Sequence, residues 1–487
     1  MVVSRSRALL LFMVTRWGRS LQFVFEEDSW ICQSHIAMPS ATMTAQEVRA
    51  VWTSEKGSMA NQTAETRWAK IIQGTIDDVG ETAAAEDVDS QKRAESIAIQ
   101  IALKGIKKGI EQNKPLTPLQ DDGKLDIQEW NKQLAAIGNC SWKHCPWLFG
   151  ECYMYRSIQR ILNSSKHWQN YDIFKRQKDS TFVKSRAAVE ELTSRYMQIV
   201  ANTQLAQDES KEEAKKLLFI EMTEIALWGN ATDLSLLANL TLEDLQNLQG
   251  REAIQKSQQN IVDNDTDDVW AYLQRTSGQA SRQIDIVLDN AGFEFFTDLL
   301  YAAYLLDAGI ATSVRLHTKE FPWFVSDVIS EDVESLFEHL DSSECFPSRE
   351  YIDQLIPRLR KFFQSGAITT TSDSFWTTPY SFHEMPVKAP ALFKELQNSY
   401  LVIFKGDLNY RKLTRDGLWP HTTTYEEALG PLGKQSGVKI LSLRTNKSDV
   451  CVGVPTQSKV DELNEKAPGG AWIQNGKYAV VSFNEGL

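Results

Sequence analysis

The segment I-D-I-V-L-D-N-A-G-F-E-F-F-T-D-L, residues 284–299, decides the fold of this chain. Its first five residues form a short apolar run typical of a buried strand, and an apolar-periodic stretch from Phe293 to Asp307 follows the polar turn at once. Further apolar runs predict strands at 312–317, 400–404, 438–443 and 478–483. Because continuous apolar strands separated by helices are typical of sheets covered on both faces, we predict an α/β fold with a Rossmann-like doubly wound, mostly parallel sheet.

The chain before this segment is patterned as helices. Residues 66–79 place Trp68, Ile71, Ile72 and Ile76 on one stripe at helical spacing, and the segments 94–108 and 212–230 continue the pattern. The pattern changes after the polar stretch 263–278. Since 487 residues are too many for one core of ordinary size, we expect a helical domain at 44–262 and an α/β domain at 263–487.

The first 43 residues are expected to be an extension, either disordered or an artefact of an upstream start codon. Four arginines flank the apolar run 8–14, and no acid appears before Glu26, a pattern that resembles a mitochondrial presequence. The run is too short to span a bilayer. We expect a cytoplasmic protein, with a nuclear location also open and a mitochondrial one only if residues 1–37 are a genuine presequence.

Composition narrows the classes of partner. Apolar residues make up 42 % of the chain and charged residues 24 %, as in ordinary globular proteins. The net charge of −12 argues against a general nucleic-acid binder, and no stretch suggests a membrane span. A small charged ligand remains compatible with this balance, because net charge says little about one pocket. The oligomeric state stays open.

Chemistry-bearing side chains follow three of the predicted strands. In open parallel sheets ligands bind beyond the carboxyl ends of the strands. The residues at those positions are Asp289 and Asn290, then Lys405, Gly406 and Asp407, then Arg444, Thr445 and Lys447. Carboxylate and amide oxygens suit Mg²⁺ or Mn²⁺, and the cations suit a phosphate group. Two plainer interpretations stay open: the acid and amide cap the next helix, and the cations are solvated surface charges.

Longer motifs carry a resemblance to a known family. They are L-D-N-A-G-F-E (288–294), W-F-V-S-D-V (323–328), F-K-G-D-L-N-Y-R-K-L (404–413) and R-T-N-K (444–447). W-G-N-A-T-D-L-S-L (228–236) and P-W-L-F-G-E-C-Y-M-Y-R (146–156) belong to the same pattern. With these motifs the chain resembles the damage-control phosphatases, in particular their sugar-phosphate subfamily, from about Thr66 to the C-terminus.

The resemblance implies an enzyme that hydrolyses small sugar phosphates of the fructose 1-phosphate or fructose 6-phosphate type. It implies a divalent ion (Mn, Co, Ni or Mg) held by Asp289, Asn290 and Asp327, which would also be the catalytic residues. The implied contacts to the phosphosugar are Asp289, Asn290, Asp407, Leu408, Asn409, Tyr410, Arg411, Arg444 and Lys447. A metal-activated water would attack the phosphoryl group.

Other functions remain as alternatives. A covalent aspartyl-phosphate mechanism normally places a second Asp two residues after the first, where this chain has Ala291. An S-adenosylmethionine-dependent protein carboxyl O-methyltransferase, an activity linked to the same family, would need a Gly-rich turn, and the turn after Leu288 holds only Gly292. A non-catalytic sugar-phosphate sensor would have no need for metal ligands. Trp376 and His383 are expected either to line the pocket or to be packed in the core.

Overall fold

The structure, a computed structural model, describes residues 12–14, 20–26, 29–33, 48–204, 212–229 and 258–487. By its contacts the chain divides into two compact units, Met1–Val48 and Arg49–Leu487. In the first unit, strands β1 (Phe12–Val14), β2 (Ser20–Glu26) and β3 (Ser29–Gln33) form an antiparallel sheet. The rest of the predicted extension 1–43 lies outside the described residues, and the expectation for it stays a prediction.

The second unit is built on a seven-stranded sheet with the order β4-β10-β9-β8-β5-β6-β7. Its strands are β4 (Ile261–Asn264), β5 (Gln283–Val287), β6 (Ser313–Thr318), β7 (Ile368–Ser372), β8 (Leu401–Lys405), β9 (Ile440–Thr445) and β10 (Ala479–Asn484). From β9 to β7 all neighbours are parallel. Strand β10 is antiparallel to β9, and β4 is parallel to β10. The predicted mostly parallel α/β sheet is confirmed, with a reversed pair at one edge.

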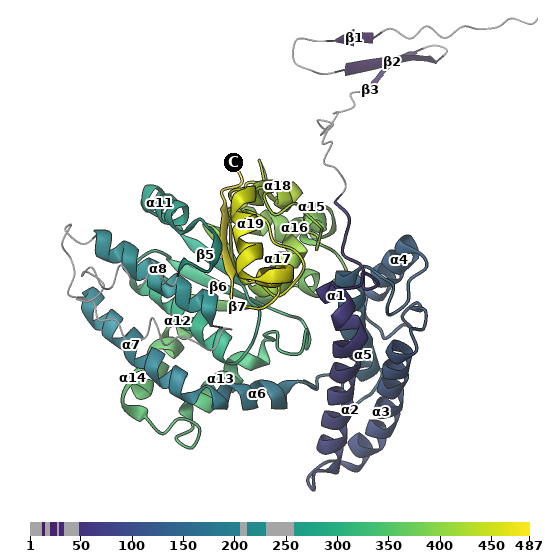
Figure 1. The fold of residues 1–487 in the computed structure, drawn as a ribbon, viewed down its shortest axis with the longest axis horizontal. Coiled ribbons are helices and arrows are strands. Elements are labelled where there is room, and N and C mark those ends of the chain that lie inside the picture. Colours follow the sequence, from purple (N-terminus) through teal and green to yellow (C-terminus); the bar gives the residue numbers. More distant parts are fainter. Residues whose placement is uncertain (1–11, 15–19, 27–28, 34–47, 205–211, 230–257) are drawn as a thin grey trace, which may run out of the picture. The chain divides into compact units, whose positions relative to one another are not determined.

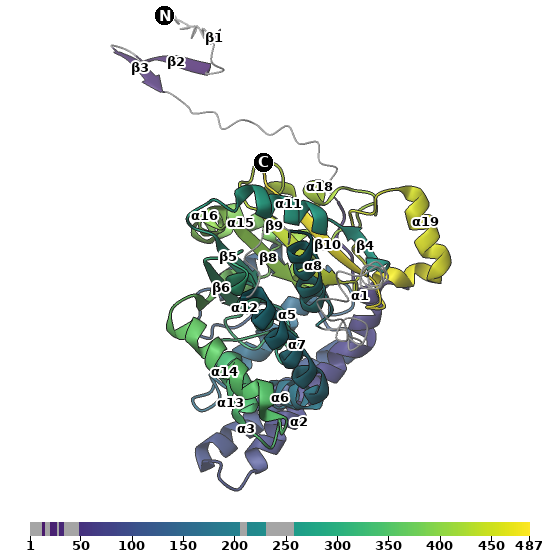
Figure 2. The same ribbon diagram turned by 90° about the vertical axis from the view of Figure 1, so that its left-hand side faces the viewer.

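Helices cover both faces of this sheet, because successive strand residues point to opposite sides. In β5, Ile284 and Ile286 enter one hydrophobic cluster and Val287 enters another. The first cluster is covered by α7 (Arg186–Gln204), α8 (Glu212–Trp228), α11 (Thr266–Thr276), α12 (Phe293–Asp307), α13 (Glu331–Asp341) and α14 (Arg349–Gln364). The second is covered by α15 (Met385–Lys388), α16 (Pro390–Asn398), α17 (Gly406–Leu413), α18 (Tyr425–Leu429) and α19 (Gln457–Lys466). Figures 1 and 2 show these layers.

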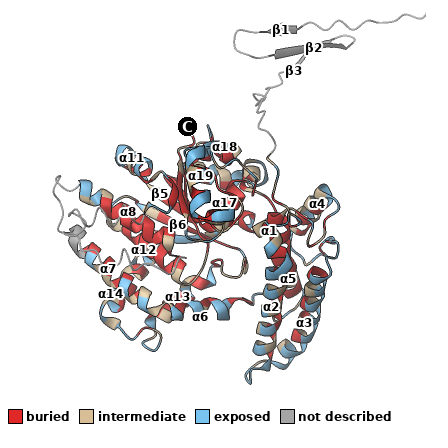
Figure 3. Ribbon diagram, viewed as in Figure 1, coloured by how far each residue is buried: buried red, intermediate tan, exposed pale blue. Residues whose placement is uncertain are grey.

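A third cluster forms the core of a helical bundle beside the sheet (Figure 1). Its helices are α1 (Met59–Gln62), the π-helical turn Thr63–Arg67, α2 (Trp68–Ala84), α3 (Ser90–Glu111), α4 (Ile127–Ile137) and α5 (Trp147–Asn163), and α6 (Lys175–Lys184) follows the bundle in the chain. Helix α5 is buried along almost its whole length. Figure 3 shows the outer helices as amphipathic, with their buried sides turned inward. Since Trp323 and Leu408 also enter this cluster, the bundle packs directly on the α/β part.

The structure differs from the sequence prediction in three details. Strands β4 and β7 were not predicted, since β4 has only four residues and β7 is a Thr-rich edge strand with mostly exposed side chains. The polar stretch 263–278, for which no helix was predicted, contains α11. Helices α7 and α8, predicted within the helical domain, pack on the sheet side of the molecule with α12. The proposed boundary at 262/263 stays a prediction.

Within the described ranges, no helix is both long and apolar enough to cross a membrane.

Candidate active site

The structure brings Asp289, Asn290 and Asp327 together at the carboxyl end of β5. The first two follow β5 directly, and Asp327 lies nine residues beyond β6 in the loop that returns to β5. This return is fixed by the backbone: the Val328 N–H donates to the Asp289 carbonyl at 2.8 Å, and Asn290 pairs with Asp327 in an isolated antiparallel bridge. Two segments of chain thus hold the three side chains at one point.

The carboxylates at this point are buried. Asp289 is 5 % exposed and Asp327 is 2 % exposed. Burial raises the pKa of Asp289 well above its ordinary value, and the nearby charges of Glu294 and Asp327 raise it further against Lys319 and Lys447. Burial also raises the pKa of Asp327 to about 6, although Lys319 opposes the shift. The ionised forms of both carboxylates are therefore disfavoured, because the nearby cations do not fully offset burial and the neighbouring acids.

The Asn290 amide is oriented by its neighbours. Its Nδ2 group donates to Asp289 Oδ2 and to Glu294 Oε2, both at 2.7 Å, and its Oδ1 accepts from the Ser326 hydroxyl. Glu294 stands in the first turn of α12, one helical turn beyond Asn290. Glu294 was not predicted as a site residue, although it lies inside the motif 288–294.

Lys319 is a second residue that the sequence pattern did not reveal. It follows β6 immediately and is 2 % exposed. Its ammonium donates to the Leu288 carbonyl at 2.7 Å and lies 3.0 Å from Asp327 Oδ2. Like Asp289, Lys319 directly follows a strand, so its position after β6 is a sequence feature that could have identified it.

Strand β8 and helix α17 approach the acids from the other side. Gly406, the first residue of α17, has a φ of +80°. Lys405 before it is buried and points into the core, where it lies 2.8 Å from Asp298 and donates to the Ala226 carbonyl. The position of Lys405 after a strand predicted a cation available for phosphate, but in the structure its charge is already paired.

The buried Arg444 forms an ion pair with the half-buried Asp407 at the start of α17. Arg444 Nε donates to Asp407 Oδ1 at 2.9 Å, and the guanidinium lies 4.5 Å from the centroid of the Tyr410 ring. Ser448 Oγ bridges the two charged groups, with distances of 2.8 and 2.9 Å. Burial favours a raised pKa for Asp407, but Arg444 and Arg411 outweigh it and hold the pKa below its ordinary value. Asp407 is therefore an ionised acceptor.

Arg411 is placed differently from the expectation that it contacts phosphate. It is 3 % exposed, and its guanidinium bonds Asp416 through two nitrogens at 2.9 Å and Glu151 at 3.0 Å. The same group lies 3.7 Å from the Trp147 ring centroid. Arg411 thus ties α17 to α5 of the helical bundle, and a direct contact to substrate stays a prediction.

The other residues of the 407–411 motif are structural in this geometry. Leu408 packs in the core of the helical bundle. Asn409 Nδ2 donates to the carbonyls of Val287, Leu288 and Lys405, and so clamps the end of β5 to β8. The Tyr410 hydroxyl accepts from the Val452 N–H at 3.1 Å. The motif supports the strand ends on which the acids stand.

Lys447 differs from Lys405, Arg411 and Arg444 in that no described residue pairs with its charge. It is half-buried, its charge acts on Asp289, and Gly476 approaches its side chain, with an ideal Cβ there 3.4 Å from Cε. Among residues 48–204, 212–229 and 258–487 its ammonium has no hydrogen bond or ion pair. The structure therefore leaves Lys447 free to meet an anion beside the acids.

The donor set at the strand ends fits a hard divalent ion. It offers two buried carboxylates with raised pKa values and one amide. Oxygen ligands of this kind suit Mg²⁺ or Mn²⁺. Within the described residues no group of three or more His, Cys, Asp or Glu side chains could hold a metal. The strand-end set differs from such a group in that its third member is an amide.

Two cavities flank the loop 320–326 that leads to Asp327. One, of about 630 Å³, is lined by Arg67, Lys70 and other residues along α2 and by Phe324, Val325 and Ser326. Since Ser326 also bonds Asn290, this cavity reaches the edge of the acid cluster.

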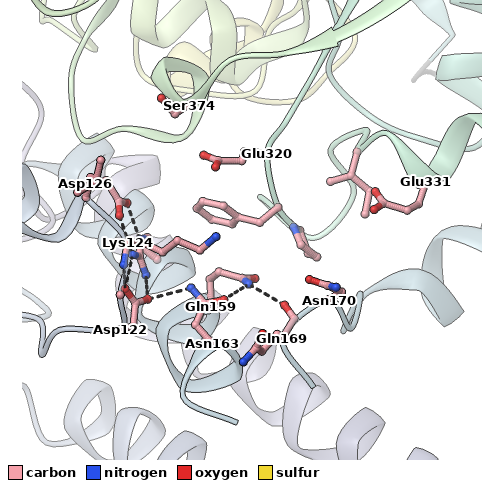
Figure 4. Close-up of a pocket in the computed structure, with 16 residues that line it drawn as sticks. Asp122, Lys124, Asp126, Gln159, Asn163, Gln169, Asn170, Glu320, Glu331 and Ser374 are labelled. Carbon is pink, nitrogen blue, oxygen red and sulfur yellow. Dashed lines mark hydrogen bonds and ion pairs between the residues drawn. The ribbon is translucent and has the colours of Figure 1, made fainter. Parts of the chain in front are cut away.

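The other cavity, of about 520 Å³, is lined by the segment 122–126, by α5 and by Glu320, Phe321 and Pro322 (Figure 4). In its wall Arg156 pairs with Asp122 at 2.8 Å and Asp126 at 2.6 Å, and Asn163 donates to Asp122 at 2.9 Å. The charges and hydrogen-bonding groups of these side chains are therefore paired with one another within the wall of the cavity.

Trp376 and His383 are packed side chains. Trp376 is 1 % exposed and contacts the rings of His317, Phe382 and Phe404. His383 donates through Nε2 to the Ala428 carbonyl at 2.9 Å. Neither residue lines the 630 Å³ cavity or the 520 Å³ cavity.

Comparisons with known proteins agree with the motifs. Residues 63–463 match the family model of the damage-control phosphatase ARMT1-like domain. A damage-control phosphatase ARMT1 from Danio rerio is 33 % identical over 88 % of this chain and 95 % of its own. The Xenopus tropicalis protein of the same name is 34 % identical over 88 % and 97 %, and the Homo sapiens protein 30 % identical over 92 % and 99 %.

Among solved structures, a DUF89 family protein from Pyrococcus horikoshii aligns with 86 % of this chain and 96 % of its own at 15 % identity, with a TM-score of 0.39. The family match spans most of the described second unit, including Asp289, Asn290, Asp327 and the motifs at 404–413 and 444–447. The chain belongs to the damage-control phosphatase family with an ARMT1-like domain.

Proposed function

We propose that this protein is a metal-dependent phosphatase that hydrolyses small sugar phosphates of the fructose 1-phosphate or fructose 6-phosphate type. The observation that carries the proposal is the convergence of Asp289, Asn290 and Asp327, together with Lys447, whose charge acts on Asp289 and which no described residue pairs. Support for the phosphatase class comes from the family to which the chain belongs. Support for the sugar-phosphate class comes from the R-T-N-K motif at 444–447.

Each of these residues has a role in the proposed reaction. Asp289, Asn290 and Asp327 would hold a divalent ion (Mn, Co, Ni or Mg), which supplies a Lewis acid for the phosphoryl group and a water of lowered pKa. Lys447 neutralises charge on the phosphoryl oxygens as a point charge. Lys319 holds the Asp327 carboxylate, and Glu294 with Ser326 fixes the Asn290 amide. Arg444 keeps Asp407 ionised, and together they support the start of α17.

Attack by water is favoured over a covalent intermediate. The position two residues after Asp289 is Ala291, whose N–H donates to the Ser326 carbonyl at 2.6 Å. That position therefore contributes a backbone contact and no acid to protonate a leaving group. Direct hydrolysis needs no such acid on this strand if the metal and Lys447 stabilise the leaving oxygen.

We also propose a cytoplasmic location. Cys140, Cys145, Cys152, Cys345 and Cys451 are free thiols, which is the usual state in a reducing compartment.

The test is a panel of phosphate esters assayed after chelator treatment and addition of Mg²⁺, Mn²⁺, Co²⁺ or Ni²⁺. We expect release of phosphate from sugar phosphates only with added metal, and loss of that activity in Asp289→Ala. Removal of a buried acid surrounded by other acids should leave the thermal midpoint unchanged or raised. Absence of hydrolysis of every ester with every metal would overturn the function, and full chelator-sensitive activity in Asp289→Ala would overturn the metal assignment.

A further inference from the structure

Helix α5 carries a buried hydroxyl that the fold leaves without a partner. Tyr155 is 1 % exposed, and across the described ranges its hydroxyl makes no hydrogen bond. Burial of an unpaired hydroxyl costs free energy, so a phenylalanine would serve packing at least as well. Two residues earlier on the same helix, the Tyr153 hydroxyl donates to the Thr117 carbonyl at 2.5 Å. The two tyrosines therefore differ in what their hydroxyls do for the fold.

Tyr155 packs against the loop that carries Asp327. Its ring is stacked on Phe324, with centroids 4.8 Å apart and an interplanar angle of 25°, and lies 5.7 Å from the Trp323 ring. Phe324 and Val325 adopt left-handed φ values of 46° and 71°, which are strained for residues with bulky side chains. Strain of this kind persists where the surroundings hold it, and the Tyr155 ring is part of those surroundings.

The charges around the hydroxyl are those of the candidate site. Burial raises the pKa of Tyr155 well above its ordinary value, Glu151 and Asp327 add to the rise, and Arg67 opposes it. The phenol is therefore a hydrogen-bond donor at neutral pH. The charges that act on it are those of Asp327, of Glu151, which pairs with Arg411, and of Arg67, which lines the 630 Å³ cavity.

The 630 Å³ cavity borders the loop against which Tyr155 packs. Phe324, on which Tyr155 is stacked, lines the cavity together with Ser326, which bonds Asn290. The Arg67 guanidinium forms no ion pair or hydrogen bond with any described residue, so its charge is available to an anion entering there. The lining of this cavity thus places Arg67 together with the loop that leads to Asp327.

We propose that Tyr155 is a substrate contact supplied by the helical bundle, whose hydroxyl donates a hydrogen bond to a phosphoryl oxygen of the bound ester. The inference rests on the proposed function for the identity of the ligand. It assigns the helical bundle a direct part in recognition, in addition to its packing against the α/β part. A charged phosphoryl oxygen is a stronger acceptor than a neutral one, so the contact should count in binding.

The experiment compares Tyr155→Phe with the matched control Tyr153→Phe. Three quantities are measured for each: the thermal midpoint, kcat/KM on the best ester of the panel, and the Kd of inorganic phosphate by calorimetry with the preferred metal. We expect Tyr155→Phe to keep or raise the thermal midpoint while it lowers kcat/KM and weakens phosphate binding about tenfold. Tyr153→Phe should lower the thermal midpoint and leave the other two quantities unchanged.

The outcomes separate this inference from the proposed function. Unchanged kcat/KM and unchanged phosphate Kd in Tyr155→Phe would overturn the inference while wild-type hydrolysis kept the function. A lowered thermal midpoint in Tyr155→Phe, without loss of phosphate binding, would show a structural hydroxyl and also overturn it. If the wild type hydrolyses no ester but binds phosphate, and Tyr155→Phe weakens that binding, the function fails and the contact stands. If the wild type neither hydrolyses nor binds, both are overturned.

Discussion

Gly406 and Asp289 are in such close contact that only glycine fits at position 406. An ideal Cβ there would lie 1.9 Å from Asp289 Oδ2 and 2.6 Å from its Cβ, and the residue has a φ of +80°. The start of α17 is thus pressed against the acid that follows β5. The two strand ends cannot be changed independently.

Gly406→Ala should therefore damage both stability and the site. Left-handed backbone and a clash with a buried carboxylate together predict a loss of at least about 2 kcal/mol in the free energy of unfolding. Displacement of Asp289 predicts a loss of activity larger than the loss of folded protein explains. Denaturant unfolding and kcat measured on the folded fraction check both effects.

The matched control is Gly105→Ala, in the middle of α3. Nothing lies within 4 Å of an added Cβ at that position, and its φ is ordinary. Since alanine is a better helix former, this variant should be more stable by up to about 1 kcal/mol and fully active. Equal behaviour of the two glycine variants would contradict the contact between Gly406 and Asp289.

A second prediction concerns the pH dependence of stability through His383. Burial lowers its pKa from 6.5 to about 4, against the hydrogen bond to the Ala428 carbonyl. Between pH 4 and pH 6.5, His383 is therefore mostly protonated in the unfolded chain and mostly neutral in the folded protein. Stability is at its full value above about pH 6.5 and should fall as the pH drops toward 4, by about 2 kcal/mol for this half-buried group.

His383→Gln isolates this effect, since the amide can still donate to the Ala428 carbonyl but does not titrate. The free energy of unfolding of the variant should change less than that of the wild type between pH 7 and pH 4.5. Parallel curves for the two proteins would show that His383 takes no part in the acid sensitivity.

Local sequence patterns predicted some residues of the candidate site and missed others, and the difference has a physical reason. Asp289 and Asn290 were found because a buried strand followed by a helix fixes where its carboxyl end lies. The predicted strand 312–317 ends one residue before β6 does, so the same rule missed Lys319. Asp327 was found only through the family resemblance, since its position depends on a loop that folds back onto β5. No local pattern encodes that return.

The ion-pair partners of the predicted cations were not visible in the sequence for a related reason. Arg411 was expected at the phosphate, but its charge is taken by Asp416 and by Glu151, which lies 260 residues away in the chain. Lys405 was predicted to be a free cation, but its partner Asp298 comes from α12. Sequence periodicity predicts which residues are buried, and it does not predict which buried charges pair. The core strands were predicted within about two residues, whereas the short edge strands β4 and β7 lack a strong pattern.

A third prediction concerns the N-terminal unit. Met1–Val48 and Arg49–Leu487 separate into two compact units by their contacts. A chain that begins at Met38 should therefore unfold with a free energy within about 0.5 kcal/mol of the full chain and turn over equally fast. Calorimetry and steady-state kinetics on the two chains test this, and a clear loss of stability would show that residues 1–37 pack on the second unit.

The last prediction separates phosphate binding from support of the fold at Lys447. Its ammonium is free among the described residues and its charge acts on Asp289, so Lys447→Ala should weaken the bound substrate and the transition state together. Loss of one charge-assisted contact should cost about 1.5–3 kcal/mol, or roughly ten- to a hundredfold in kcat/KM, with KM raised and kcat lowered. Lys447→Arg should recover only part of this, because a planar guanidinium does not replace a compact ammonium. Lys477→Ala is the matched control: this exposed lysine lies in the same loop as its neighbour Gly476, and its loss should change kcat/KM by less than about twofold. Equal kcat/KM for Lys447→Ala and Lys477→Ala on the best ester of the panel would remove Lys447 from the site.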